Sequence, residues 1–246
     1  TSGTLSVGGN WDDVGGIFIH NSGTIDFTSA SARTFTTLGS QTYNNITHSG
    51  IGNLTLSIWQ YRRLISIDHT KVPDVADPTA TYAGFPILIS TSGLSNINAN
   101  GTDIRFTTSD GKTLLPREIE SYSSGTLVAW VKMTLTKDAG DLSDDTLYMY
   151  YGNSSATEPA TSSAYGSQNV WNSGFKGVWH MNNNAANTTV TESTSNANTG
   201  TAQQNTSSLT ATGQDDGALT FNGTSDYVEA GSLIPLDSNN WTLGMW

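Results

Sequence analysis

Apolar and polar residues alternate along several short runs in the middle of the chain, which is the pattern of a β-strand with one buried face. Asp103-Ile104-Arg105-Phe106 is one example, and the runs end at turn residues such as Ser109-Asp110-Gly111-Lys112. Six such runs lie at 61–70, 85–89, 103–106, 116–122, 127–133 and 147–151. Short strands separated by turns in this way predict an antiparallel β-sandwich.

Residues 1–57 carry apolar positions with a longer repeat. Ser2-Gly3-Thr4-Leu5 recurs twenty residues later as Ser22-Gly23-Thr24-Ile25. A repeat of this length fits the rungs of a parallel β-solenoid, in which the apolar row of each turn stacks on the next. A pair of ordinary hairpins is the alternative. For a solenoid we expect fewer than three rungs and, because rungs need stacking neighbours, a chain that continues upstream.

The first 57 residues resemble the repeats of large prokaryotic surface adhesins with a β-helix stalk, a likeness carried by Gly8-Gly9-Asn10-Trp11 and by residues 20–24. Residues 58–157 resemble, along their whole length, a β-sandwich family of unassigned function from large secreted or surface proteins of bacteria and archaea. Separated motifs carry this second likeness: residues 59–63, 67–72, 85–89, 103–106, 118–120, 127–132 and 148–153. The resemblance implies an architecture and a location, but no reaction.

Residues 158–169 follow the sandwich and contain Glu158-Pro159-Ala160-Thr161-Ser162-Ser163, a composition that predicts a linker. The remaining unit, 170–246, resembles the opening half of a laminin-G-like, concanavalin-A-like jelly roll. The likeness rests on residues 170–171, 177–181, 193–200, 216–223, 226–228 and 241–246. Where that family usually has Asp-Ser before an Asn-rich turn, this chain has Glu192-Ser193, which weighs against a metal site at that turn.

The jelly roll is expected to be incomplete within this chain. The last residues, 241–246, read as a strand, and too few residues follow Val170 to close two sheets. An open sandwich would leave apolar faces and strand edges in water. We therefore expect either a chain that continues or strands lent by a second copy.

The predicted fold class is therefore all-β: a short β-solenoid-like or hairpin segment, an antiparallel β-sandwich and a partial jelly roll.

Charged residues make up 13% of the chain and the net charge is −11. A nucleic-acid partner needs a basic surface, so this composition argues against one. There is no cysteine, which excludes disulfides and thiolate sites. No apolar run is long enough to span a membrane.

Acidic residues are concentrated near the end of the chain. No Lys or Arg follows Lys176, whereas six acidic residues do: Glu192, Asp215, Asp216, Asp226, Glu229 and Asp237. A solvated acidic surface explains this pattern, and a hard cation bound by several oxygens is the alternative. We expect a Ca²⁺ site at Asp226, with Asn222 as a second oxygen donor across the Gly223 turn.

Two glutamates in the sandwich are candidates for a catalytic pair. Glu118 and Glu120 lie two residues apart on a predicted strand, so both point to one face, about 6–7 Å apart. That separation is near the range of glycosidase carboxylates. Catalytic pairs usually come from different strands, however, and pairing with Arg62, Arg63, Arg105 or Arg117 on neighbouring strands is the preferred interpretation. No histidine pair has metal-ligand spacing, and we expect no enzyme activity.

Tryptophans of the last unit are the remaining binding candidates. Trp171, Trp179, Trp241 and Trp246 all follow Val170, and exposed indole faces stack on sugars. A buried tryptophan in a sandwich core is the ordinary alternative. We select Trp179 and Trp241 as the ligand-binding residues.

These observations favour a non-catalytic fragment of an extracellular or cell-surface protein that acts in adhesion or carbohydrate binding. Its expected partners are glycans or other surface proteins. One alternative is a structural subunit or stalk of a prokaryotic surface filament or layer, in which copies of the chain contact each other. A second alternative is an accessory module of a secreted polysaccharide-degrading enzyme.

Overall fold

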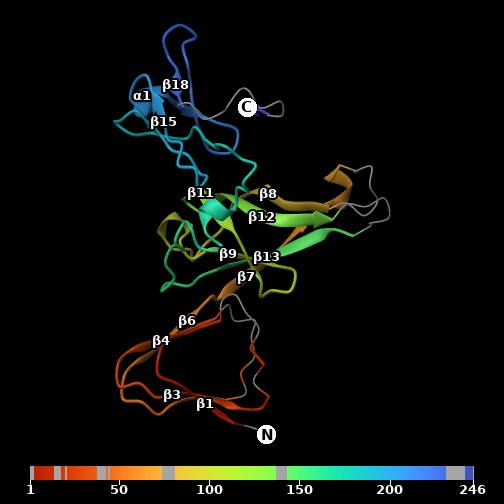
Figure 1. Cartoon of the computed structure of the whole chain (residues 1–246), viewed down its shortest axis with the longest axis vertical. Coiled ribbons are helices and arrows are strands. Elements are labelled where there is room, and N and C mark those ends of the chain that lie inside the picture. The colour runs from red at the N-terminus through yellow and green to blue at the C-terminus, as the bar shows by residue number, and fades with distance from the viewer. Residues whose placement is uncertain are drawn as a thin grey trace.

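A computed structural model describes residues 3–13, 18–19, 21–37, 43, 45–73, 81–136, 143–230 and 242–245, with the backbone alone at 55–57. The regular secondary structure of these residues is almost all β-strand, as predicted. Three units follow one another along the long axis: a solenoid, a sandwich and a C-terminal unit (Figure 1). None of the helices in these residues is long and apolar enough to cross a membrane.

Parallel strands build the first unit. One sheet has the order β1-β3-β5 and the other β2-β4-β6, and all neighbours are parallel. The strands are β1 (Thr4–Val7), β2 (Trp11–Asp12), β3 (Thr24–Phe27), β4 (Arg33–Thr37), β5 (Asn45–His48) and β6 (Leu54–Ile58). Parallel pairing confirms the solenoid and not the hairpins. The expectation of fewer than three rungs is wrong, because three strands stack in each sheet.

The predicted repeat sets the stacking of these rungs. Leu5 pairs with Ile25, and Ile25 pairs with Ile46, so the repeated apolar position forms one row. Ile25 and Phe27 pack with Phe35 in a small core between the two sheets. At one corner Gly50 lies so close to the preceding rung that a Cβ there would approach the carbonyl oxygen of Ser29 to 2.2 Å. Only glycine allows the backbones to stack this tightly.

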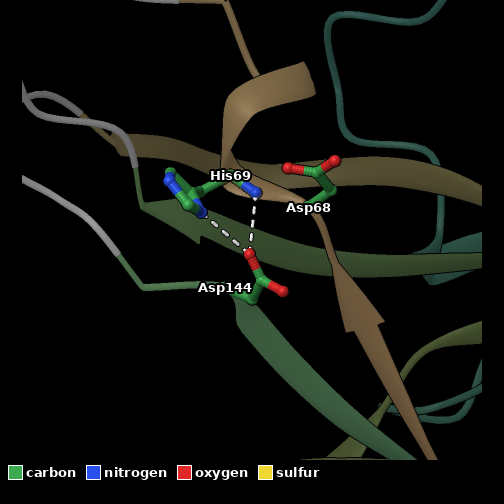
Figure 2. A group of neighbouring side chains, drawn as sticks. All are labelled: Asp68, His69 and Asp144. Carbon is green, nitrogen blue, oxygen red and sulfur yellow. Dashed lines mark hydrogen bonds and ion pairs between the residues drawn. The ribbon is translucent and has the colours of Figure 1, made fainter.

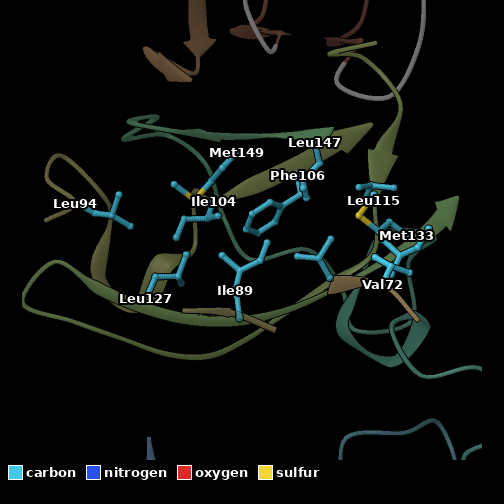
Figure 3. Close-up of a cluster of buried hydrophobic side chains, with 13 residues drawn as sticks. Val72, Ile89, Leu94, Ile104, Phe106, Leu115, Leu127, Met133, Leu147 and Met149 are labelled. Atoms are coloured by element: carbon cyan, nitrogen blue, oxygen red, sulfur yellow. The ribbon is translucent and has the colours of Figure 1, made fainter. Parts of the chain in front are cut away.

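The second unit is an antiparallel sandwich of a four-stranded sheet, β10-β9-β13-β7, and a three-stranded sheet, β11-β12-β8. Its strands are β7 (Tyr61–Ile67), β8 (Thr81–Thr91), β9 (Arg105–Thr108), β10 (Leu114–Leu115), β11 (Arg117–Ser123), β12 (Thr126–Thr136) and β13 (Asp145–Tyr151). Two 3₁₀ helices, η1 (His69–Lys71) and η2 (Ala99–Gly101), lie in its connections. Alternating side chains of both sheets fill the space between them, including Ile104, Phe106, Leu127, Leu147 and Met149, which are all fully buried (Figure 3).

Trp59 joins the solenoid to the sandwich. It lies between β6 and β7 and is only 6% exposed. Its indole N–H donates a hydrogen bond to the main-chain carbonyl of Asp103, and the guanidinium of Arg105 lies 5.4 Å from its ring centroid. A buried indole with its N–H satisfied holds the end of the solenoid against the sandwich.

Residues 158–169, predicted to be a linker, instead pack on the sandwich. Arg117 is 1% exposed, and its guanidinium makes a bidentate ion pair with Glu158. The distances are 2.5 Å from Nη1 to Oε1 and 2.8 Å from Nη2 to Oε2. The backbone N–H of Arg117 also donates to the carbonyl of Tyr165, and η3 (Ser167–Asn169) lies against β11. The segment packs here because the buried Arg117 needs a carboxylate, and Glu158 supplies it.

The C-terminal unit has only short elements. A three-stranded sheet, β14-β15-β18, and a hairpin, β16-β17, accompany one helical turn. The bounds are β14 (Thr189–Val190), β15 (Gly200–Ala202), α1 (Thr206–Leu209), β16 (Thr210–Thr212), β17 (Gly217–Leu219) and β18 (Val228–Glu229). Val190, Ala202 and Leu209 form its core. In the part of this unit that the structure describes, the two sheets have three and two strands, and residues 242–245 form no strand, contrary to the expectation for 241–246.

Matched leucine substitutions test the sandwich core. Leu127 is fully buried, whereas Leu64 on β7 is 54% exposed. Leu127→Ala should lower the free energy of unfolding by about 2–5 kcal/mol, because it removes buried methyl groups and leaves a cavity. Leu64→Ala should lower it by less than about 1 kcal/mol. Urea unfolding measures both, and equal losses would contradict the assigned core.

Candidate functional site

Titratable side chains meet aromatic ones where the C-terminal unit touches the sandwich. We call this group the junction cluster; it consists of Glu118, Glu120, Trp130, Trp171 and His180. Glu118 and Glu120 lie on β11, and Trp130 lies opposite Glu118 on β12. The β11–β12 register shifts between Ile119 and Ser121, so Glu120 is the extra residue of a β-bulge. Both carboxylates contact His180, so they lie on one face of the strand, as the period of two predicts.

Each carboxylate of the junction cluster accepts an indole hydrogen bond. Trp130 Nε1 donates to Glu120 Oε2 at 2.7 Å, and Trp171 Nε1 donates to Glu118 Oε2 at 2.7 Å. The hydroxyl of Ser193 donates to Glu118 Oε1 at 2.6 Å. Trp171 and Ser193 come from the chain beyond the sandwich, so Glu118 binds the C-terminal unit directly. Burial raises the pKa of Glu120 above its usual value, because the ionised form loses solvation.

His180 lies between the two carboxylates. Its Nε2 is 3.4 Å from Glu118 Oε2 and its Nδ1 is 3.3 Å from Glu120 Oε2. The imidazole ring lies 5.9 Å from Trp130 and 5.9 Å from Trp171, measured between ring centroids. Burial alone would lower the pKa of His180, but the contact with Glu118 and the charges of Glu118, Glu120 and Asp216 outweigh it, and the pKa is raised.

These contacts differ from the expected arginine pairs. Neither glutamate is paired with an arginine among the described residues, and Arg117 on the same strand is bound by Glu158. The oxygens of Glu118 and Glu120 face indole, hydroxyl and imidazole groups of the protein itself. The side chains of Glu118, Glu120 and His180 are only 14%, 9% and 12% exposed. Chemically, the cluster is arranged to join two units.

A second group of titratable residues lies in the sandwich, just after β7 and just before β13. Asp68, His69 and Asp144 bring their ligand atoms within 4.8 Å of one another (Figure 2). Asp144 Oδ1 accepts a hydrogen bond from the backbone N–H of His69 at 3.0 Å and lies 2.9 Å from its Nδ1. Among the described residues this is the group that could offer three such ligands to a metal ion. Asp144 is 75 residues from His69, so no local pattern indicated the pair.

The hydrogen bonds of this group already stabilise the local chain. Asp68 Oδ1 accepts from the backbone N–H of Thr70 and caps η1. Asp144 Oδ2 accepts from the hydroxyl of Ser66 at 2.8 Å. Hydrogen bonds from His69 and Ser66 lower the pKa of Asp144 to about 2. An exposed turn held by two carboxylates accounts for these contacts.

The predicted calcium residues do meet in one turn. Asp226 Oδ2 accepts from the backbone N–H of Asn222 at 3.1 Å, and Gln204 donates to Asp226 Oδ1 at 3.1 Å. Asn222 Oδ1 accepts from the backbone N–H groups of Thr224, Ser225 and Asp226. The oxygens therefore close the turn around Gly223, and a cation would have to share them with these donors.

Of the predicted ligand-binding tryptophans, Trp241 lies outside the described residues. Trp179 packs against the C-terminal core of Val190, Ala202 and Leu209, and its Nε1 donates to the carbonyl of Asn198 at 3.0 Å. Gly177 lies against its six-membered ring, where a Cβ would come within 2.1 Å. These contacts give Trp179 a packing role. A sugar could stack only on the part of the indole that these contacts leave exposed.

An apolar groove runs between the edge strands of the two sheets. β7 ends the four-stranded sheet and β8 ends the three-stranded one. The groove has a volume of about 740 Å³ and is lined by residues 63–67, residues 85–91 and Trp130. Leu64, Phe85 and Leu88 are 54%, 46% and 37% exposed along it. The sequence indicated the alternating strands but not which of them lie at an edge.

Comparison with known proteins returns one match. A family model described as a domain of unknown function (DUF2341) matches residues 100–168. This agrees with the predicted family of unassigned function, and the match extends through the segment that packs on β11. It stops before the C-terminal unit. No curated protein and no solved structure matches the chain.

The pKa of Asp144 predicts a contribution to acid stability. A carboxyl whose pKa is depressed on folding stabilises the protein above its ordinary pKa of about 3.9, and this contribution is lost as the pH falls from there to about 2. Asp144→Asn should therefore reduce the loss of stability over this pH range. Thermal unfolding between pH 2 and 5 measures it, with the exposed Asp215→Asn as the control. Identical profiles of wild type and Asp144→Asn would contradict the assignment.

Proposed function

We propose that the chain is a non-catalytic part of an extracellular surface protein, in which a β-solenoid stalk carries β-rich units that act in adhesion. The observation that supports this most is the end-to-end order of three units with a buried joint between each pair. Trp59 forms the first joint and the junction cluster the second. A rod with such joints keeps a binding surface at a distance from the point of attachment.

The solenoid is the part best suited to a stalk. Each rung contacts only its neighbours, so such a unit extends in one direction without enlarging its core. Asp26 accepts hydrogen bonds from Thr47 and Ser49 of the following rung, which adds polar contacts to the backbone ladder. Neutral hydrogen-bonding residues dominate the chain, and the charged fraction is only 13%. This composition is common in exposed β-structure outside the cell.

Carbohydrate is the ligand class we propose, with other surface proteins as the alternative partner. The proposal assigns the C-terminal unit to a laminin-G-like jelly roll. Trp241 is the better of the two tryptophan candidates, because Trp179 is engaged by its own unit. Trp241→Ala and Trp246→Ala separate a specific sugar contact from a general loss of aromatic surface.

A glycan array tests this function. The purified chain should bind a limited set of glycans, and Trp241→Ala should reduce that binding at least tenfold while Trp246→Ala leaves it within about twofold, since one stacked indole carries most of the binding energy. The bound glycan should be recovered intact. Absence of binding to every glycan, or cleavage that Glu118→Gln abolishes, would contradict the proposal.

A Ca²⁺ site at Asp226 and Asn222 is the proposed cofactor site. Titration calorimetry should show heat on adding Ca²⁺, and Asp226→Asn should remove it because the site loses its only full charge. Asp215→Asn is the matched control, an exposed aspartate of the same unit that should leave the heat unchanged. A melting temperature that chelator does not change, together with no heat, would count against calcium.

The groove between β7 and β8 favours a second candidate, a structural subunit of a surface filament or layer. Exposed apolar side chains beside two edge strands form a surface that another β-strand can extend. Concentration-dependent assembly that Leu64→Glu prevents would favour this role over glycan binding.

A further inference from the structure

The junction cluster combines two carboxylates at most 14% exposed, one imidazole and a contact between two units. We propose that it is a proton-operated latch: the C-terminal unit stays docked on the sandwich while His180 is positively charged between Glu118 and Glu120, and it is released when His180 loses its proton. This goes beyond the proposed adhesive role, because it makes the docking of the C-terminal unit on the sandwich depend on pH.

The geometry favours a cation at His180, because its ring lies between two carboxylates and its Nε2 has no other partner among the described residues. The two ring nitrogens of His180 lie 3.4 Å from Glu118 Oε2 and 3.3 Å from Glu120 Oε2. Both nitrogens carry a proton in the imidazolium ion, whereas neutral imidazole has one N–H and one lone pair. After deprotonation, one nitrogen lone pair therefore faces a carboxylate oxygen. Water has little access to weaken that repulsion, since these side chains are at most 14% exposed.

Aromatic rings form the walls around this cation. The ring of Trp130 is nearly parallel to that of His180, with an interplanar angle of 26° and a centroid distance of 5.9 Å. Trp171 lies at the same centroid distance, tilted by 52°. A positive charge within about 6 Å of an indole face is attracted by the ring quadrupole. Trp130 belongs to the sandwich and Trp171 follows it, so the charged imidazole draws the two parts together.

No lysine or arginine replaces His180 at this place within the described part of the chain. The stem of Lys132, on the same strand as Trp130, lies over Gly84, and the amine of Lys176 donates to the carbonyl of Ser173 at 3.4 Å. One further acid acts on the cluster: Asp216 adds a negative charge near His180 and accepts a hydrogen bond from Asn182. Loss of the imidazolium thus leaves only negative charge.

The direction of the pH effect follows from both titrating groups. The pKa of His180 is raised in the docked form, so its contribution is complete below the ordinary value of about 6.5 and is lost as the pH rises through the raised value. The pKa of Glu120 is also raised by burial, so its ionisation disfavours docking as well. The docked form therefore holds more protons than the released form. One proton of difference weakens docking by about tenfold per pH unit.

The first experiment measures the proton itself. The chain has four histidines, so the imidazole resonances of the intact protein can be followed by NMR between pH 5 and 9 and assigned with one variant each. We expect His180 to titrate above 6.5. Glu120→Gln keeps an amide oxygen for the indole of Trp130 and should lower the His180 pKa by at least half a unit. A His180 pKa below 6.5, or one unchanged by Glu120→Gln, would overturn the latch.

The second experiment measures release. Small-angle X-ray scattering of the whole chain should show a larger maximum dimension above the His180 pKa than below it. His180→Gln cannot carry a charge, and it should give the same dimension at pH 6 and pH 9. His48→Gln, an exposed residue of β5, is the matched control and should behave like wild type. A wild-type dimension that does not change with pH, or a change that persists in His180→Gln, would show that docking is not linked to this proton.

Discussion

A buried charge must find partners inside the protein, and Asp103 meets this constraint where three segments of the chain converge. It is fully buried, and its carboxylate accepts hydrogen bonds from the backbone N–H groups of Asn98, Gly152 and Asn153. Its main-chain carbonyl accepts the indole N–H of Trp59. The end of the solenoid, the η2 loop and the exit from β13 are thus held at one point. Removing one partner from such a network would leave a buried polar group unsatisfied, which is more costly than any single hydrogen bond is stabilising.

The two joints of the rod rest on different chemistry. The joint between solenoid and sandwich uses an indole and a main-chain carbonyl, which do not titrate in the physiological range. The joint between sandwich and C-terminal unit uses carboxylates and an imidazole, and in our proposal its strength depends on the protonation state of His180. Between them, Arg117 and Glu158 hold residues 158–169 against β11, so this segment belongs to the sandwich in structure as well as in the extent of the matching family. A rigid first joint and a conditional second one would let only the outer unit respond to its surroundings.

Predictable features of the site were those in which the relevant residues are close in sequence. Glu118 and Glu120 share a face because strand side chains alternate, and Asn222 and Asp226 share a turn because four residues separate them. Their partners were not predictable in the same way. Glu118 and Ser193 are 75 residues apart, and so are His69 and Asp144. The arginines expected to neutralise the glutamates are engaged elsewhere: those of β7 and β9 belong to the other sheet, and Arg117 binds Glu158.

Periodicity along the chain was enough to determine the class of fold. A spacing of twenty residues in the first segment favoured stacked parallel rungs over hairpins, and alternation of apolar residues predicted a sandwich, because both patterns reflect which side of a strand is buried. Tertiary structure alone decided which strands form the edges of the groove, that residues 158–169 pack as part of the sandwich, and that His180 lies between two carboxylates. These features depend on contacts between segments 40 to 75 residues apart. Such contacts depend on how the whole chain packs, because a buried polar group pairs with whichever partner the tertiary structure brings close. A local sequence pattern does not contain that information.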